Sequence, residues 1–174
     1  MTDIKCIAAF DLATHCGWCL WHKDKDKEAD DLTSGVWNMS LKPHESSGMR
    51  IVAFGGHLNR LLQTYPDIQM IVWEDVQFVK HRLAYKVHCE LAGKLQEWAI
   101  NNKLEHTGVS VGEIKRFATG KGNASKDMMM AAARLRWAEY SFADDNEVDA
   151  RWLMETTLNR YQLRTTDGQT AMGR

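Results

Sequence analysis

The chain has 174 residues, 44% of them hydrophobic, and its 22 basic and 23 acidic residues give a net charge of −1. A chain of this size can bury a core without disulfide or metal staples, so we expect a single domain. The near-neutral charge argues against a protein that coats nucleic acid by charge alone. No apolar stretch is long enough to span a membrane, no signal peptide is present, and the four cysteines are irregularly spaced, which together predict a cytoplasmic protein without membrane partners.

Three strands are predicted at the start of the chain. Residues 4–10 form an apolar run that is typical of a buried strand, and residues 17–21 and 32–37 predict two more. The polar run 23–27 predicts a solvated turn between the last two strands. The pattern indicates an antiparallel meander.

Helices and strands alternate after the meander. Apolar residues recur at helical spacing from Ile51 to Leu62, and Pro66 ends this helix. The later elements are predicted, in chain order, as a strand over 70–74, a helix over 82–100, a strand over 104–111, and helices over about 125–140 and 147–161. From residue 164 onward apolar periodicity is lost, so the domain is predicted to span 1–163 and to be followed by a flexible tail.

Four acidic residues occupy the ends or beginnings of predicted elements. Asp11 and Glu74 each close an apolar run, and Asp145 and Asp149 open the last helix-like segment. Carboxylates at strand ends can converge on divalent metals such as Mg²⁺, which can clamp a phosphodiester during attack by water. Acidic residues also favour helix starts for local capping reasons, so the prediction of a metal-dependent nuclease rests on all four together.

A basic cluster lies between the second and third of these acids. Lys115, Arg116, Lys121 and Lys126 fall within twelve residues. Such a patch beside an acidic pocket would hold phosphates while the pocket recruits metal. Lys121 lies between two glycines, in a loop able to approach a DNA backbone. The alternative for any one of these lysines is a solvated position on a helix exterior.

The order of predicted elements describes a ribonuclease H-like α/β fold, with a mixed five-stranded sheet and helices on both faces. Four segments in matching order also resemble the RuvC-type Holliday-junction resolvases. They are residues 7–18 (IAAFDLATHCGW), 72–78 (VWEDVQF), 113–126 (EIKRFATGKGNASK) and 145–150 (DNEVDA). The most diagnostic is the third, in which two lysines flank a Gly-x-Gly-x-Ala run. The resemblance spans roughly residues 4 to 160.

The resemblance implies a Mg²⁺-dependent endonuclease, with Mn²⁺ as a substitute, that cuts four-way or otherwise branched DNA. It assigns the metal to Asp11, Glu74 and Asp149, assisted by Asp145 or Asn146. It also implies that an ammonium group neutralises charge developing on the phosphate, a role that falls to Lys126 and Lys115.

The resemblance further implies contacts with DNA beyond the metal site. Phe78 matches an exposed aromatic residue that stacks on an unpaired base, and Lys80 follows it closely. Because a four-way junction is nearly two-fold symmetric and two strands must be cut, a homodimer is expected. A stripe of Leu91, Leu95 and Trp98 on the helix over 82–100 is a candidate interface, although a buried core helix explains it equally well.

Helix geometry bears on the fourth metal-site residue. At about 100° per residue, Asp145 and Asn146 share a face with Asp149, whereas Glu147 lies roughly 200° away and is predicted to be a helix-start or surface residue. Asp145, like Asp127, is equally explained as an N-terminal charge favoured by the helix dipole. Asp75 should point to the sheet face opposite Glu74 and so is not predicted to bind the metal.

Two positions depart from the family pattern. Ala13 stands where a glycine is common, and Asn146 stands where many members have an acid or a histidine. The second departure keeps open a catalytically silent DNA-junction binder of the same fold. A sugar-kinase-like ATPase fragment would also use the first-strand acid, but it would need a second nucleotide-binding half that this chain is too short to hold.

Other motifs carry less weight. The glycine spacing of residues 119–122 does not match a Walker phosphate loop. The set His15, Cys16, Cys19 and His22 does not favour zinc, because positions 16 and 19 would face opposite sides of one strand. The small size and the unusual sequence within a recognisable family suggest a bacteriophage or mobile element as the source, and hence a bacterial or phage-infected cytoplasm.

Overall fold

The computed structural model describes residues 4–23, 32–76 and 81–163, and they form a five-stranded sheet between two helical layers. The strands are β1 (Cys6–Asp11), β2 (His15–His22), β3 (Leu32–Asn38), β4 (Met70–Asp75) and β5 (Glu105–Ser110), arranged in the order β3-β2-β1-β4-β5. The first three are antiparallel, whereas β4 and β5 run parallel to β1. The predicted meander and mixed sheet are therefore confirmed.

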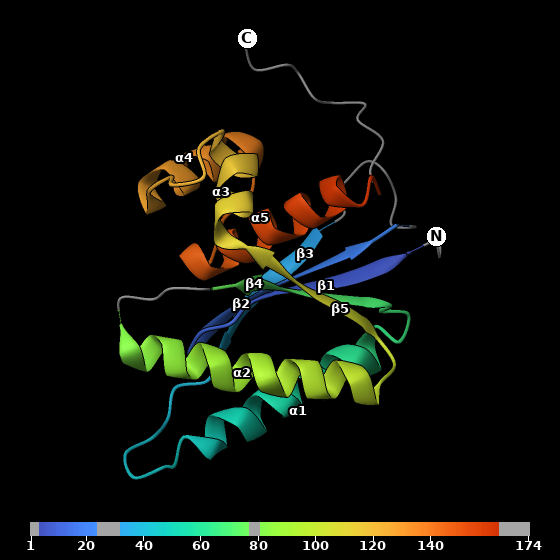
Figure 1. Cartoon of the computed structure of the whole chain (residues 1–174), viewed down its shortest axis with the longest axis vertical. Coiled ribbons are helices and arrows are strands. Elements are labelled where there is room, and N and C mark those ends of the chain that lie inside the picture. The colour runs from blue at the N-terminus through green and yellow to red at the C-terminus, as the bar shows by residue number, and fades with distance from the viewer. Residues whose placement is uncertain (1–3, 24–31, 77–80, 164–174) are drawn as a thin grey trace.

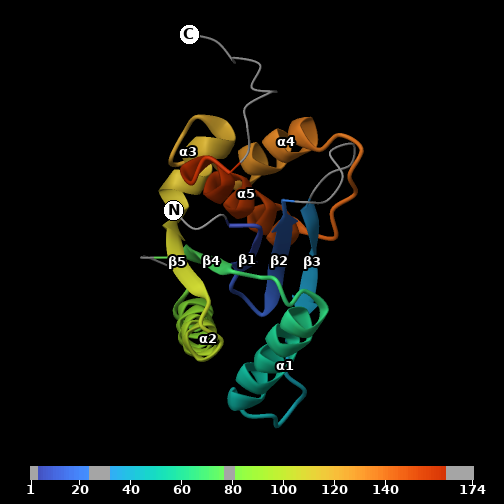
Figure 2. The ribbon, with the colours of Figure 1, turned by 90° about the vertical axis from the view of Figure 1, so that its right-hand side faces the viewer.

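Helices cover both faces of this sheet, as predicted (Figure 1). The helices α1 (Gly48–Thr64) and α2 (Arg82–Asn101) lie on one side, and α3 (Val111–Thr119), α4 (Lys126–Arg136) and α5 (Asp145–Arg160) lie on the other, an arrangement that Figure 2 shows from the side. The nine-residue α3 was not among the predicted elements, because so short a helix carries little apolar periodicity. It is delimited instead by its Ser110 cap and by Gly120, whose left-handed backbone (φ 78°) ends it.

The three central strands β2, β1 and β4 are largely buried on both faces, and their residues alternate between two separate cores. In β1, Cys6, Ala8 and Phe10 pack in the core beneath α1 and α2, whereas Ile7 and Ala9 pack in the core beneath α5. This alternation follows from the two-residue period of a strand. Asp11 continues the second series and so belongs to the α5 side.

The apolar stripe on α2 belongs to the core. Leu91 and Leu95 are fully buried and Trp98 is 5% exposed, all in the cluster beneath the sheet. The indole N–H of Trp98 also donates to Asn59 Oδ1 of α1 at 2.8 Å. This packing decides between the two explanations of the stripe in favour of a core helix. Among the residues that the structure describes, no helix is both long and apolar enough to cross a membrane.

Candidate active site

The ends of β1 and β4 place two carboxylates side by side. The two strands are parallel, with Phe10 paired to Trp73, so that Asp11 and Glu74 occupy the next step of each. Both residues continue the series that points toward α5. Asp75, one residue further, points to the other side. There its negative charge contributes an upward effect on the pKa values of His88 and Tyr85 of α2, although burial lowers the pKa of His88 overall. The predicted opposite orientations of Glu74 and Asp75 are thus present in the structure.

A glycine brings the third carboxylate close to this pair. Gly17 is the β2 partner of Asp11, and a Cβ atom on it would lie 1.9 Å from the backbone oxygen of Asn146. The first turn of α5 therefore rests directly on the sheet where β1 ends. Asp149 follows one turn later, and its charge raises the pKa values of both Asp11 and Glu74.

All three carboxylates resist ionisation. Burial is the main cause, and it raises the pKa of Asp11 well above its usual range, that of Glu74 to about 7 and that of Asp149 to about 6. Repulsion among the acids adds to this effect for Asp11 and Glu74. Oxygen donors that repel one another in a buried site are the ligand set that a hard divalent cation stabilises. The donor chemistry of the site therefore fits Mg²⁺ or Mn²⁺.

A fourth acid near this site is Asp144, which the sequence analysis did not identify. It caps α5 by accepting hydrogen bonds from the backbone N–H groups of Asn146 and Glu147, at 2.9 and 3.2 Å. Its charge raises the pKa values of Asp11 and Asp149. Because the predicted helix began at residue 147, the capping position was misplaced. The signal that would have revealed it is the Asp144–Asp145 pair, in which the first residue caps the helix and the second begins it.

The two predicted candidates for the fourth site residue have other contacts. Asp145 forms an ion pair with Lys126, the first residue of α4. Asn146 donates its side-chain amide to Asp144 Oδ2 at 3.0 Å. Both lie in the first turn of α5, one turn before Asp149, as the helix phase predicted.

Lys115 and Lys126, the two lysines that the family resemblance assigns to the site, approach the carboxylates from different helices. Lys115 of α3 lowers the pKa values of Glu74 and Asp149, and Lys126 lowers those of Asp11 and Asp149. Lys115 is half-buried, whereas the Lys126 side chain is 71% exposed. The structure thus brings both ammonium groups within electrostatic range of the acids, although they are distant in sequence from Asp11.

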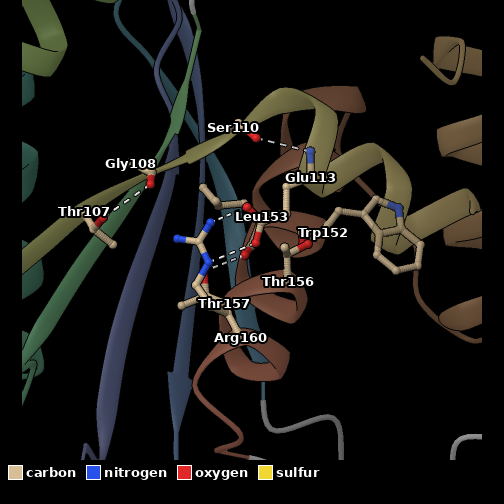
Figure 3. Close-up of polar contacts among 9 residues, drawn as sticks. All are labelled: Thr107, Gly108, Ser110, Glu113, Trp152, Leu153, Thr156, Thr157 and Arg160. Carbon is tan, nitrogen blue, oxygen red and sulfur yellow. Dashed lines mark hydrogen bonds and ion pairs between the residues drawn. The ribbon is translucent and has the colours of Figure 1, made fainter. Parts of the chain in front are cut away.

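Two tethers hold α3, and with it Lys115, against the rest of the molecule (Figure 3). Ser110 Oγ accepts the Glu113 backbone N–H at 3.3 Å, which caps the helix. The Glu113 carboxylate takes two hydrogen bonds from the Arg160 guanidinium in the last turn of α5, one of them at 2.9 Å. A two-pronged contact of this kind fixes orientation as well as distance.

The remaining predicted DNA-binding residues lie at the periphery of the site or outside the described residues. Arg116 and Lys121 are exposed on α3 and on the loop that leads to α4. Gly122 of that loop lies against the Arg116 guanidinium, since a Cβ there would be 3.2 Å from Nη2. Phe78 and Lys80 fall outside the described residues.

Glu147 lies in the first turn of α5, as predicted for a helix-start residue, whereas the alternative prediction of a surface position was wrong. Glu147 is 2% exposed and accepts hydrogen bonds from Ser34 Oγ, Tyr140 Oη and the Ala143 backbone N–H at 2.6–2.7 Å. Its angular separation from Asp149 directs it toward β3 and the chain segment before α5. That side is covered by protein, because α5 is buried almost all round between the sheet and α3 and α4.

Arg151 extends this buried contact network. It is fully buried, its guanidinium stacks over the Tyr140 ring at 3.7 Å, and its Nε donates to Ser34 Oγ at 2.7 Å. The network ties α5 to β3 and to the segment that carries Asp144. It therefore fixes the start of α5 from the side opposite the carboxylates.

Neither the protein-family models nor the curated proteins contain a match to this sequence. Solved structures do resemble it. The structure of Thermus thermophilus RuvC superposes with a TM-score of 0.68 at 17% identity, covering 91% of this chain and 97% of that one. T. thermophilus RuvC in complex with a Holliday junction substrate gives 0.70 at 14% identity, covering 91% and 96%.

The yeast mitochondrial Holliday junction resolvase Ydc2 gives a TM-score of 0.60 at 12% identity, covering 92% of this chain and 82% of that one. The three likenesses each cover more than nine tenths of this chain. The protein thus has the ribonuclease H-like fold of RuvC-type resolvases.

Proposed function

We propose that the protein is a divalent-metal-dependent endodeoxyribonuclease that resolves four-way junctions and related branched DNA by paired phosphodiester hydrolysis. One observation carries the proposal: on a resolvase fold, half-buried carboxylates from β1, β4 and α5 converge beside two lysines. Without a bound cation, the ionised form of such a cluster is high in free energy, because each ionised acid repels the others in a poorly solvated site.

The roles of the acids follow from their placement. Asp11, Glu74 and Asp149 would hold Mg²⁺, or Mn²⁺ in its place, with Asp144, Asp145 or Asn146 at the rim of the site. A bound pair of such ions supplies an activated water and stabilises the leaving 3′ oxygen. Binding metal would also shift the three carboxylates to their ionised forms, since a divalent cation outweighs the burial and the repulsion that now raise their pKa values.

The lysines would act on the phosphate. Lys115 and Lys126 lie within range of the carboxylates, so a scissile phosphate held there would lie between the acids and the ammonium groups. Their positive charge would stabilise the extra negative charge that develops on the phosphoryl oxygens during attack. Lys126 would have to leave its ion pair with Asp145, or share it, to do so.

Branched DNA is the proposed substrate because two of the solved neighbours are a complex with a Holliday junction substrate and a Holliday junction resolvase. Arg116, Lys121, Phe78 and Lys80 would contact it outside the metal site. A homodimer would present two sites to the two strands of the nearly two-fold symmetric junction. The protein would act in the cytoplasm of a bacterium or a phage-infected host.

The test is incubation of purified protein with labelled four-way, three-way and linear duplex DNA, with and without Mg²⁺. We expect paired incisions in four-way DNA that require the metal and are lost in Asp11→Asn and Glu74→Gln, while junction binding holds or strengthens because repulsion toward phosphate falls. Asp75→Asn is the matched control, since Asp75 adjoins Glu74 but faces α2. Binding of junctions without cleavage by the folded, Mg²⁺-supplied wild type would instead support a silent junction binder.

A further inference from the structure

A second group of metal-binding side chains lies at the other end of β1 from Asp11. The donor atoms of Cys6, His22 and Asp67 all lie within 4.8 Å of one another. Cys6 begins β1 and Asp11 ends it, five residues later, which corresponds to roughly 17 Å along the strand. This group is therefore separate from the carboxylate cluster of the candidate active site.

The sheet itself brings the three residues together. Cys6 of β1 is paired with His22, the last residue of the antiparallel β2, so that both side chains project from the same face. The turn that precedes β4 is held at the same edge, because the Gln69 backbone N–H donates to the Cys6 carbonyl at 3.0 Å. Asp67 lies in this turn, and its Oδ2 forms an ion pair with His22 Nε2.

The three donors differ in chemistry from those of the active site. A thiolate, an imidazole and a carboxylate form a mixed sulfur, nitrogen and oxygen set, which favours zinc and related transition metals over Mg²⁺. Tetrahedral zinc places its ligand atoms about 3.5 Å apart, so the widest separation among the three donors would need to close by about 1.3 Å at most, while His22 Nε2 and Asp67 Oδ2, which are in direct contact, would need to move apart by a similar amount. Little rearrangement of the backbone would be required.

We propose that Cys6, His22 and Asp67 form a binding site for one zinc-type transition-metal ion. Cys6 is fully buried, whereas the side chains of His22 and Asp67 are 21% and 49% exposed, so the site opens toward solvent on the side of the carboxylate. Water can fill the fourth position there. Binding would release the Cys6 thiol proton to solvent and would join β1, β2 and the turn before β4, which should stabilise the fold.

Cobalt is the appropriate probe, because it reports sulfur ligation by a thiolate-to-metal charge-transfer band. Chelator-treated wild-type protein would be titrated with Co²⁺ in excess Mg²⁺, which occupies oxygen-rich sites. We expect the band to saturate at one ion per chain and to disappear on addition of Zn²⁺. Zn²⁺ should also raise the melting temperature of the wild type.

Single substitutions identify the ligands. Cys6→Ser should remove the band, and His22→Gln and Asp67→Asn should each weaken Zn²⁺ binding by at least about tenfold in calorimetry. Cys16→Ser is the matched control, because Cys16 is a buried cysteine at the opposite end of β2, where burial and, after it, the charge of Asp11 raise the pKa of its thiol. This control should keep the band and the affinity.

Three results would overturn the proposal. They are a wild type that gives no charge-transfer band, a band that is lost in Cys16→Ser rather than in Cys6→Ser, and unchanged Zn²⁺ affinity in both His22→Gln and Asp67→Asn. The last two variants alter partly exposed side chains, so they decide the question even if Cys6→Ser fails to fold. Unchanged affinity in them would mean that His22 and Asp67 form an ion pair only.

Discussion

Gly17 and the backbone carbonyl of Asn146 are in such close contact that no larger residue fits between the start of β2 and the first turn of α5. A Cβ on Gly17 would lie 1.9 Å from the Asn146 oxygen and 2.4 Å from its carbonyl carbon. These neighbours are backbone atoms, so relief requires α5 to move. The separation of Asp149 from Asp11 and Glu74 therefore depends on a glycine that carries no functional group.

Gly17→Ala should displace α5 and so disrupt both stability and metal binding. We expect a loss of about 1–3 kcal/mol in the free energy of unfolding, typical of overpacking, and weaker Mg²⁺ binding in calorimetry. Gly93→Ala on α2 is the control, because a Cβ there meets nothing within 4 Å, and alanine should stabilise that helix by up to about 1 kcal/mol. Equal effects of the two substitutions would remove the positioning role of Gly17.

Glu74→Gln should stabilise the metal-free protein at neutral pH. The pKa of Glu74 rises from 4.5 to about 7 on folding, so the folded state binds the proton more tightly and its stability falls as the pH rises between these values. A shift of this size corresponds to about 3 kcal/mol, which glutamine would recover.

Thermal melts of this variant and wild type in a chelator should coincide near pH 4 and separate with increasing pH until the difference levels off above about pH 7. Mg²⁺ should close the gap at high pH by stabilising the wild type alone. Asp75→Asn controls for the loss of a neighbouring carboxylate. A gap that is constant across the pH range would contradict the buried, proton-binding role of Glu74.

Lys126→Ala distinguishes stabilisation of the reacting phosphate from simple binding of DNA. If Lys126 neutralises charge that develops only during cleavage, the single-turnover rate at saturating enzyme should fall by about 10²-fold or more, with little change in junction affinity. If it only binds phosphate in the ground state, affinity should fall and the salt dependence should flatten by about one unit of slope.

Asp145→Asn is the matched variant for this experiment, because it breaks the same ion pair and leaves the ammonium in place. It should keep most of the rate if the lysine acts on phosphate and if Asp145 does not itself hold the metal; Mg²⁺ binding by this variant in calorimetry tests the second condition. A full saturating rate in Lys126→Ala would exclude the catalytic role.

Glu147→Ala and Asp149→Ala should have opposite consequences. Removing Glu147 leaves Ser34, Tyr140 and the Ala143 N–H without their buried acceptor, which should lower the free energy of unfolding by about 3 kcal/mol. Removing Asp149 removes a half-buried carboxylate that burial makes difficult to ionise, so stability should hold or rise in the absence of metal while cleavage is abolished. Chemical denaturation beside single-turnover cleavage separates the two, and a stable, fully active Glu147→Ala protein would show that the network is dispensable.

The placement of Asp11 and Glu74 was predictable from the sequence, because strand alternation is a local property. Each acid ends an apolar run, and the two-residue period assigns it to one face of the sheet without knowledge of the neighbouring strands. The opposite orientation of Asp75 follows from the same period. Apart from the short α3, the order of strands and helices was also accessible from apolar periodicity, which is why the mixed sheet with helices on both faces was predicted correctly.

Tertiary packing alone decided the surroundings of α5. The helix phase predicts that Glu147 points away from Asp149, but it does not determine whether the Glu147 side chain then faces solvent or protein. Here it leads to Ser34, whose strand lies over a hundred residues earlier in the chain. In the same way, the capping role of Asp144 depends on where α5 begins, and the burial of the α2 stripe depends on its packing against the sheet. Such contacts join distant segments, so they follow from the folded arrangement and not from local sequence patterns.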